Sequence, residues 1–546
     1  MLTDQLLYER IVSPANLERA FNYACNERVK NPFYDPLEIE WFEQNREKFL
    51  DSLSQNLKSP ESFRQSGSFA FFPPKTNLCY RRMIFIPMSD LVARYALVTV
   101  IADEVDIRLH PKSFSSRRAG GAEAEKYFLK KYDESGWPQF VKWQESSANN
   151  FNYLLKTDIS SFFDSVSHRD LEKVIAEALG LDIKSDVIRL LGKFLKVKVH
   201  SYSHKNNSIA KPSVMKQGLA IGNNPDSYLA NLYLMNIDSQ MEIEGVEYGR
   251  YMDDIRIFTN DMSTMRHAII VLQESLLNLG LNLNASKTEL ASSGIEMKRL
   301  ISKHTDAYDY DEPDEVVIAE NRLLKGIDRD FKDPSVTFSK EDTLLKDGDA
   351  KDFCKFLSAS QTKKKPFDNM KFMKPWHIER VGNILREFSG AGKHAAWLIV
   401  QSAFFSSVDP KVQERAIRVI EEIFEDATVN SYIKYRITHF LTKPSEKNGH
   451  YRINTYHHSW KSWFIEKFTG FLSEPAIELN LVAIRALRVL GLSESEIRTL
   501  IGRHSIKPLP IPVNTALQAL SIPLESGKTV RVYDEIEDEI DYNDYI

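Results

Sequence analysis

Two adjacent carboxylates, Asp253 and Asp254, lie within residues 248–258, where apolar and β-branched residues flank them on both sides. This pattern predicts a tight hairpin with both acids at its tip. Adjacent carboxylates repel each other and gain nothing from burial unless a cation holds them together. Mg²⁺ suits such a pair, because it takes one or two carboxylates and completes its shell with water and substrate phosphates. The pair could therefore transfer a nucleotide, although an isolated Asp-Asp pair is also common in solvated turns.

A third carboxylate strengthens the interpretation as a metal site. Asp158 lies at the end of the apolar run 153–159, and a helix is expected soon afterwards with Ser167 as its N-cap. Asp158 would then stand at the C-terminal end of a strand, next to the hairpin tip. Three converging carboxylates could hold two Mg²⁺ ions, of which one activates a primer 3′-hydroxyl and the other neutralises the leaving pyrophosphate.

The motifs around these acids resemble those of reverse transcriptases. Asp158 with Phe162 and Phe163 resembles motif A, and residues 251–254, Tyr-Met-Asp-Asp, resemble motif C. Residues 217–234, which begin Gln-Gly-Leu-Ala-Ile-Gly, are similar to motif B. In this family the three motifs occur in the same order along the chain.

Further signatures flank these three motifs. Residues 281–288 are similar to motif D, and residues 81–94 and 113–118 resemble two signatures of the fingers. The resemblance covers roughly residues 15–300, and six motifs in order are far more specific than any one of them. It implies an α+β fold, a right-hand polymerase with palm and fingers. Such an enzyme would make DNA from dNTPs, with RNA or single-stranded DNA as partner or without a template.

The resemblance also implies a role for each motif residue. The expected ligands of two Mg²⁺ ions, for which Mn²⁺ can substitute, are Asp158, Ile159, Asp253 and Asp254. The expected catalytic residues are the three acids and Lys287, which would protonate the departing pyrophosphate or help to neutralise it. The expected substrate-binding residues are Arg82, Arg117, Arg118, Phe163, Gln217, Gly218 and Tyr251.

Physical reasons accompany several of these roles. Guanidinium groups suit phosphate oxygens, so Arg82, and Arg117 or Arg118, would grip the incoming triphosphate. Phe163 would occupy the place of a ribose 2′-hydroxyl and select deoxynucleotides. Gly218 would allow close approach of the backbone. The motif D lysine could instead be an ordinary surface side chain, and the Gln-Gly pair an ordinary turn.

Motif B departs from the pattern of many bacterial reverse transcriptases, which place a proline two residues after the glycine. Ala220 stands at that position, and Pro225 ends the run that follows. In this respect the chain looks more like the abortive-infection (Abi) and unknown-group reverse transcriptases of bacteria than like retron or group II intron enzymes. That likeness implies a role in defence against phage, a closed homo-oligomer, and DNA synthesis that starts on a protein hydroxyl.

The composition is typical of a globular protein with several domains. The chain has 546 residues, of which 42% are hydrophobic and 27% are charged. We expect a cytoplasmic protein with no membrane partner, because the three cysteines are scattered and neither a long apolar run nor a secretory signal is evident. The resemblance to Abi-type enzymes implies that this cytoplasm is bacterial. The net charge of −5 is unusual for a nucleic-acid enzyme, but the acidic residues 533–546 hide a more basic body.

Five regions are expected along the chain: an N-terminal helical segment (1–60), palm and fingers (61–305), a linker (306–350), an α-helical domain (351–523) and an acidic tail (524–546). Two apolar stripes, each after a proline, predict helices in the fourth region. They indicate either HEAT-like helical repeats or an ordinary α-helical domain, and the helical-repeat domain of Abi-type enzymes favours repeats. The candidate priming residues in the tail are Tyr533, Tyr542 and Tyr545.

Three functions compete at this point. The first is a reverse transcriptase that acts in anti-phage defence. The second is a retron-like or intron-derived reverse transcriptase that copies a dedicated non-coding RNA. The third is a catalytically silent, RNA-binding oligomeric scaffold, against which the intact carboxylates and Phe163 count. An RNA polymerase is disfavoured, because Phe163 should clash with a ribose.

Overall fold

In the computed structural model, the described residues are 3–30, 36–76, 79–130, 136–200, 202–203, 208–209, 213–308, 373–387, 392–404, 408–442, 458–474, 476–505 and 511–520. The expected linker beyond residue 308 lies outside the described residues, as does the acidic tail. The three tail tyrosines, Tyr533, Tyr542 and Tyr545, are therefore outside them too. Among the described helices, none is long and apolar enough to cross a membrane.

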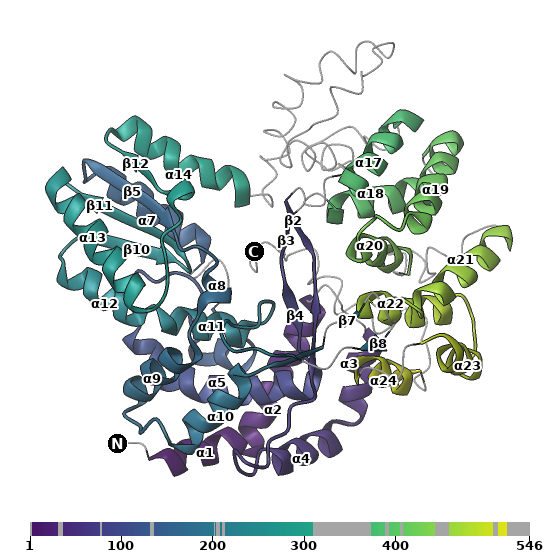
Figure 1. The fold of residues 1–546 in the computed structure, drawn as a ribbon, viewed down its shortest axis with the longest axis horizontal. Coiled ribbons are helices and arrows are strands. Elements are labelled where there is room, and N and C mark those ends of the chain that lie inside the picture. The colour runs from purple at the N-terminus through teal and green to yellow at the C-terminus, as the bar shows by residue number, and fades with distance from the viewer. Residues whose placement is uncertain are drawn as a thin grey trace.

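The N-terminal helices pack around a long central helix, α5 (Met88–Val105). They are α1 (Asp4–Val12), α2 (Pro14–Lys30), α3 (Pro36–Gln44) and α4 (Arg46–Asn56). The helices α1 and α2 contact α5, whereas α3 and α4 contact α2. Thr3 caps α1, because its hydroxyl accepts a hydrogen bond from Leu6 N at 3.3 Å. Nearly every side chain of α5 is buried, so this helix forms the centre of the first hydrophobic core (Figure 1).

One four-stranded sheet, which we call the mixed sheet, has the order β4-β1-β6-β9. Its strands are β1 (Ser68–Phe71), β4 (Met83–Phe85), β6 (Lys198–His200) and β9 (Ser213–Val214). The strand β1 is antiparallel to β4 and parallel to β6. Two further strand pairs are β2 (Pro74–Thr76) with β3 (Cys79–Tyr80), and β7 (Tyr202–Ser203) with β8 (Ser208–Ile209).

A second four-stranded sheet, which we call the antiparallel sheet, has the order β10-β11-β5-β12. Its strands are β5 (Tyr153–Asp158), β10 (Glu247–Tyr251), β11 (Asp254–Thr259) and β12 (Glu289–Ala291). Successive side chains point to opposite faces. Leu154, Phe258 and Ala291 pack on one face, with α7 and α14, whereas Leu155 and Ile257 belong to the first core on the other. Both faces of the sheet are therefore covered (Figure 1).

The remaining elements of this half connect and cover the two sheets. They are η1 (Asp106–Arg108), η2 (Gly121–Glu125), α7 (Trp137–Ala148), α8 (Phe162–Ser165), α9 (His168–Leu179), α10 (Asp186–Leu195), α11 (Asn224–Tyr233), α12 (Met235–Ile243), α13 (Met262–Asn278), η3 (Ala285–Lys287) and α14 (Gly294–Tyr308). Ser167 is the N-cap of α9, as expected, and its hydroxyl accepts from Asp170 N at 3.3 Å. The α+β expectation is confirmed for this half of the chain.

The C-terminal half is helical throughout its described residues. The helices are α17 (Pro375–Glu387), α18 (Gly392–Phe404), α19 (Pro410–Glu425), α20 (Ser431–Leu441), α21 (His458–Phe471), α22 (Ile477–Val489), α23 (Glu494–His504) and α24 (Ile511–Ala519). Asp409 caps α19 and Pro410 opens it, and the expected apolar stripe of this helix is buried. The even-numbered helices α18, α20, α22 and α24 contact one another in succession, α17 contacts α19, and α21 contacts α23.

A second hydrophobic core joins the mixed sheet to the C-terminal helices. Phe69, Phe71, Met83 and Phe85 of β1 and β4 belong to the same cluster as the buried side chains of α17 to α24. Asn430 Nδ2, at the start of α20, donates to the carbonyl of Phe72 at 3.5 Å. The C-terminal helices therefore pack directly on the mixed sheet, on the side away from the antiparallel sheet (Figure 1).

Candidate active site

The expected hairpin is present at the acid pair. Tyr251 faces Asp254 as the last pair of β10 and β11, and Met252 and Asp253 form the two-residue turn. Met252 has a φ of 56°, in the left-handed region that residues with a side chain rarely adopt. Such a conformation costs roughly 1–3 kcal/mol and persists only where the surroundings hold it. The turn that carries Asp253 is therefore strained.

Asp158 meets the hairpin as the sequence predicted. It ends β5 and stands directly opposite Asp254 in the antiparallel register, so both side chains point to the same face. Its carboxylate accepts a hydrogen bond from Asn284 Nδ2 at 3.2 Å and lies 3.1 Å from Lys287 Nζ. The neighbouring Ile159 is buried and is bridged to the segment before η3. The three acids and Lys287 thus come together, whereas the sequence analysis had not singled out Asn284.

Asp253 carries the strongest electrostatic signal of the three acids. Burial first, and then the neighbouring Asp158 and Asp254, raise its pKa from 3.8 to about 7, against smaller lowering effects that include Lys287. A cation would relieve this repulsion. The donors fit Mg²⁺ in kind, because all are carboxylate oxygens, the ligands that this ion prefers. As they stand, however, no group of three acidic, histidine or cysteine side chains among the described residues is arranged to hold a metal ion.

A buried arginine behind the acids was missed by the sequence analysis. Arg256 Nη1 lies 3.7 Å from Asp254 Oδ1, and its Nε donates to Gln144 Oε1 of α7 at 2.9 Å. Its guanidinium also lies over the ring of Phe140, 5.4 Å from the ring centre. The signal was available in the strand period, since a residue two positions after Asp254 shares its face. Only the partner on α7 was beyond the reach of the sequence.

Gly218 and Phe163 lie where motifs A and B meet. Gly218 has a φ of 83°, and a Cβ atom there would lie 3.0 Å from the carbonyl oxygens of Phe163 and Asp164. Gly218 N donates to Val166 O, and Leu219 N donates to Phe163 O, both at 2.8 Å. Only glycine satisfies both the backbone conformation and this contact. The half-buried ring of Phe163 is therefore held in place by the backbone of motif B.

An exposed ion pair spans the space between the two sheets. Arg82 Nη2, just before β4, lies 3.2 Å from Asp164 Oδ1 on α8. The side chains are 41% and 51% exposed, so a competing anion could reach either partner. Gln217 is also exposed, and its Nε2 donates to the carbonyl of Asp164 at 3.5 Å. Arg82 and Gln217 are thus brought together through Asp164.

The other expected substrate-binding residues have internal partners. Arg117 donates to Asp106 and to the carbonyls of His110 and Ser113, and it is mostly buried.

Arg118 is buried as well and pairs with Asp103 at 2.8 Å. Tyr251 packs edge-on against Trp137 of α7, with ring centres 5.2 Å apart. Among the described residues, the hydrogen bonds of the guanidinium groups of Arg117 and Arg118 do not reach the three acids. The structure therefore does not bring these two arginines into the acid cluster.

The comparison with known families agrees with this geometry. Residues 82–339 match the family described as reverse transcriptase (RNA-dependent DNA polymerase). The match begins at Arg82 and includes all three acids. No curated protein matches the chain. The family acts on nucleotides and nucleic acid and implies catalysis by divalent metal ions. The chain therefore contains a reverse transcriptase domain, and it is an RNA-directed DNA polymerase, a nucleotidyltransferase.

Proposed function

We propose that this reverse transcriptase makes DNA from dNTPs with Asp158, Asp253 and Asp254 as its catalytic acids. The observation that carries the proposal is that Asp158 and Asp254 face each other at the ends of neighbouring strands, with Asp253 beside them in the hairpin turn. These acids, with the main chain at Ile159, would hold two Mg²⁺ ions, for which Mn²⁺ can substitute. When bound, the ions activate the primer 3′-hydroxyl and neutralise the leaving pyrophosphate.

The protein's own side chains would bind and orient the nucleotide. Phe163 would face the sugar and exclude a ribose 2′-hydroxyl, which is supported by the close packing of motif A on Gly218. Arg82 would bind the triphosphate after leaving Asp164, with Gln217 beneath the base. The role of general acid for the pyrophosphate falls to the motif D lysine, whose Nζ is 3.1 Å from an acid of the site.

The remaining residues that were expected to bind substrate have indirect roles in this proposal. Tyr251 would act through its packing on α7. Arg117 and Arg118 would reach a triphosphate only if their ion pairs with Asp106 and Asp103 open. The loop that carries them, residues 113–118, would otherwise support the site from behind.

We further propose that the enzyme belongs to the Abi or unknown-group type and acts in anti-phage defence in the bacterial cytoplasm. The departure at Ala220 supports this assignment. The two rows formed by α17 to α24 support HEAT-like repeats, on which a homo-oligomer or a non-coding RNA could assemble. Priming would use a protein hydroxyl, with Tyr533, Tyr542 and Tyr545 as candidates outside the described residues.

The test is incubation of the full chain, purified from cells, with each labelled dNTP separately and with no added primer or template. The products are run on a denaturing gel with and without protease. Label that stays with the protein until digestion is the expected result, and it would establish protein priming. The inactive control is Asp254→Asn, which removes one acid and also weakens its ion pair with the buried Arg256.

Other results would redirect the proposal. Incorporation only after RNA and an oligonucleotide primer are supplied would favour a retron-like or intron-derived enzyme, as would a copurifying RNA copied into a defined DNA. Binding of nucleic acid with no incorporation in Mg²⁺ or Mn²⁺ would favour the silent scaffold. Label incorporated equally by wild type and Asp254→Asn would overturn the assignment of the acids.

A further inference from the structure

Backbone strain is concentrated in segments around the acids. Among the described non-glycine residues, a left-handed φ occurs at Ser116, Ser161 and Met252, with values of 50°, 48° and 56°. Ser116 lies in the loop 113–118, Ser161 just before Phe162, and Met252 in the hairpin turn. Each of these conformations needs surroundings that hold it. The carbonyls of Ser116 and Met252 both accept hydrogen bonds from one buried network.

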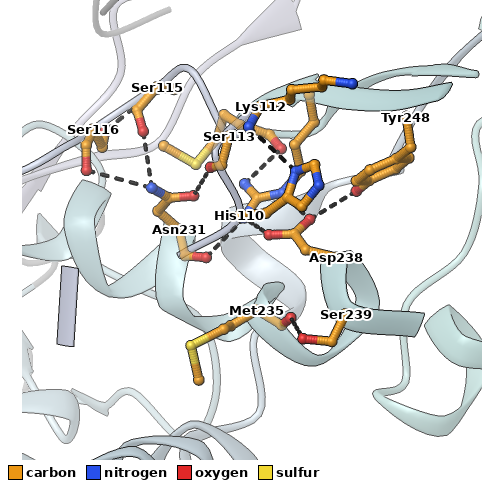
Figure 2. Close-up of polar contacts among 12 residues, drawn as sticks. His110, Lys112, Ser113, Ser115, Ser116, Asn231, Met235, Asp238, Ser239 and Tyr248 are labelled. Atoms are coloured by element: carbon orange, nitrogen blue, oxygen red, sulfur yellow. Dashed lines mark hydrogen bonds and ion pairs between the residues drawn. The ribbon is translucent and has the colours of Figure 1, made fainter. Parts of the chain in front are cut away.

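This network centres on Arg250, whose side chain is fully buried. Its Nε and Nη2 donate to the two carboxylate oxygens of Asp238 on α12, both at 2.7 Å. Its Nη1 donates to Met252 O at 3.3 Å, and its Nη2 also donates to Asn231 O at 3.1 Å. Tyr248 donates to Asp238 at 2.9 Å from the same strand as Arg250 (Figure 2). One guanidinium thus connects the turn to α11 and α12.

Asn231 extends the network to the loop 113–118. Its Oδ1 accepts from Ser113 Oγ at 2.7 Å, and its Nδ2 donates to the carbonyl of Ser115 at 2.8 Å and to that of Ser116 at 3.4 Å. Figure 2 shows Asn231 between these three serines. The side chain is itself fully buried. One amide therefore holds the strained point of the loop.

The main chain joins the same two segments. Arg250 N donates to Lys112 O, and Phe114 N donates to Arg250 O, both at 3.0 Å. Ser113 is bridged to Arg250 in parallel, so the loop lies along the free edge of β10. The loop and the catalytic hairpin therefore form one connected body.

Stability alone does not account for the ion pair in this network. Desolvation offsets most of the attraction within a buried pair, and well-packed apolar residues often replace such a pair without loss of stability. A fork of donors in a fixed plane, by contrast, determines the position of everything it holds. The function of the pair is therefore better sought in the position of the turn.

We propose that Asn231, Asp238 and Arg250 form a positioning unit that fixes the Met252–Asp253 turn relative to the loop 113–118. The proposal rests on the function proposed above, in which Asp253 is a catalytic acid. None of the three residues touches substrate in this role. They act through the turn, which carries Asp253 at the position where metal and nucleotide meet.

The decisive variant is the double substitution Arg250→Met with Asp238→Leu, which replaces the ion pair by apolar side chains of similar size. Its melting temperature is compared with that of wild type, together with kcat and KM for single-nucleotide incorporation and the affinity for Mn²⁺ by electron paramagnetic resonance. We expect a melting temperature a few degrees below that of wild type, because the Tyr248 hydroxyl and the carbonyls of Met252 and Asn231 lose their partners. Measured where the variant is folded, the KM for dNTP should stay within about threefold. Because a displacement of about 1 Å can cost about 100-fold in rate, kcat should fall by about that factor. Mn²⁺ binding should weaken by about tenfold, because the residues that orient a metal ligand are removed.

A second variant serves if the double variant does not fold. Arg250→Lys keeps the buried charge and one contact to Asp238 but loses the fork that reaches Met252. We expect kcat about tenfold lower and Mn²⁺ binding measurably weaker.

The matched control is Arg28→Met, at another buried arginine, which donates to Ile86 O at 2.7 Å and pairs with Glu38 at 3.6 Å. It should lose stability while its kcat and Mn²⁺ affinity stay unchanged at a temperature where it is folded.

The outcomes separate the two proposals. Wild-type kcat and Mn²⁺ affinity in both hairpin variants would overturn the positioning unit and leave the proposed function standing. The same losses of kcat and Mn²⁺ affinity in Arg28→Met would mean that general destabilisation causes them, and they would also overturn the positioning unit. If wild type itself makes no DNA, the proposed function fails. The comparison of Mn²⁺ affinity between wild type and the hairpin variants then still decides whether the positioning unit fixes the turn.

Discussion

The two four-stranded sheets of this protein differ in what they bury. The antiparallel sheet ends in three carboxylates and buries two arginines, Arg250 and Arg256, one on each face. The mixed sheet buries aromatic side chains, Phe69, Phe71 and Phe85, in one core with the C-terminal helices. A buried ion pair is weak evidence for stability, whereas burial of one phenylalanine stabilises by about 1.5–3 kcal/mol. The antiparallel sheet therefore carries the candidate catalytic acids, whereas the mixed sheet packs against the C-terminal helices.

The largest expected effect in the antiparallel sheet is that of Asp253→Asn, which should change DNA synthesis and stability in opposite directions. The substitution removes a metal ligand, and it also removes a carboxylate whose pKa is raised to about 7 by burial and then by repulsion from Asp158 and Asp254. We expect DNA synthesis to fall on the order of 10⁴-fold. At pH 8 without metal, the free energy of unfolding should rise by on the order of 1–3 kcal/mol. Incorporation assays and urea denaturation measure the two effects, and a loss of stability would contradict the electrostatic account.

In the mixed sheet the expected effect is on stability. Phe71 is 2% exposed and packs in the core shared with the C-terminal helices, whereas its neighbour Phe72 is 49% exposed. Phe71→Ala should lower the free energy of unfolding by roughly 3–5 kcal/mol, because it leaves a cavity. The matched control Phe72→Ala should change it by less than about 0.5 kcal/mol. Equal effects in denaturant titrations would show that the two regions do not share a core.

The raised pKa of Asp253 in the antiparallel sheet predicts that both stability and Mg²⁺ binding depend on pH. In the folded, metal-free protein Asp253 keeps its proton up to about pH 7, whereas the unfolded chain releases it near 3.8. The stability of the metal-free protein should therefore fall as pH rises through this window. Metal binding must displace the proton, so the Mg²⁺ concentration for half-maximal synthesis should be about tenfold higher at pH 6 than at pH 8.

Two measurements check this pH dependence. Mg²⁺ titrations at both pH values report the competition between metal and proton. Urea denaturation of the metal-free protein serves as the control, because the stability gain of Asp253→Asn at pH 8 should be much smaller at pH 5 and should disappear only below pH 3.8, where the carboxyl is neutral in both the folded and the unfolded chain. An unchanged Mg²⁺ requirement would mean that Asp253 ionises normally.

The smallest expected effect concerns the ion pair that connects the two sheets. Asp164 holds Arg82 in the absence of nucleotide, so Asp164→Asn should free the guanidinium for the triphosphate. Exposed pairs contribute about 0.2–1 kcal/mol, and the KM for dNTP should therefore fall by about two- to fivefold. Asp170→Asn, at another exposed acid whose partner is Lys173, is the matched control and should leave KM unchanged. A higher KM in Asp164→Asn would mean that Asp164 helps to bind the nucleotide.

Much of the local structure could be predicted because neighbouring residues determine it. The alternation of apolar residues around Asp253 and Asp254 predicted the hairpin, and Ser167 predicted the start of α9. Proline and an apolar stripe predicted α19. In each case the physical cause, a strand period, a capping hydroxyl or a helical face, acts within a few residues.

The amino-acid sequence by itself thus determined the acid motif, its hairpin, and a helical region after the reverse transcriptase domain. Only the tertiary structure decided the partners of the arginines. Arg117 and Arg118 turned out to pair with Asp106 and Asp103, whereas Arg250 reaches the catalytic turn. The reason is that a guanidinium satisfies whichever acceptors the folded chain brings near it, and those acceptors lie on segments far apart in the sequence.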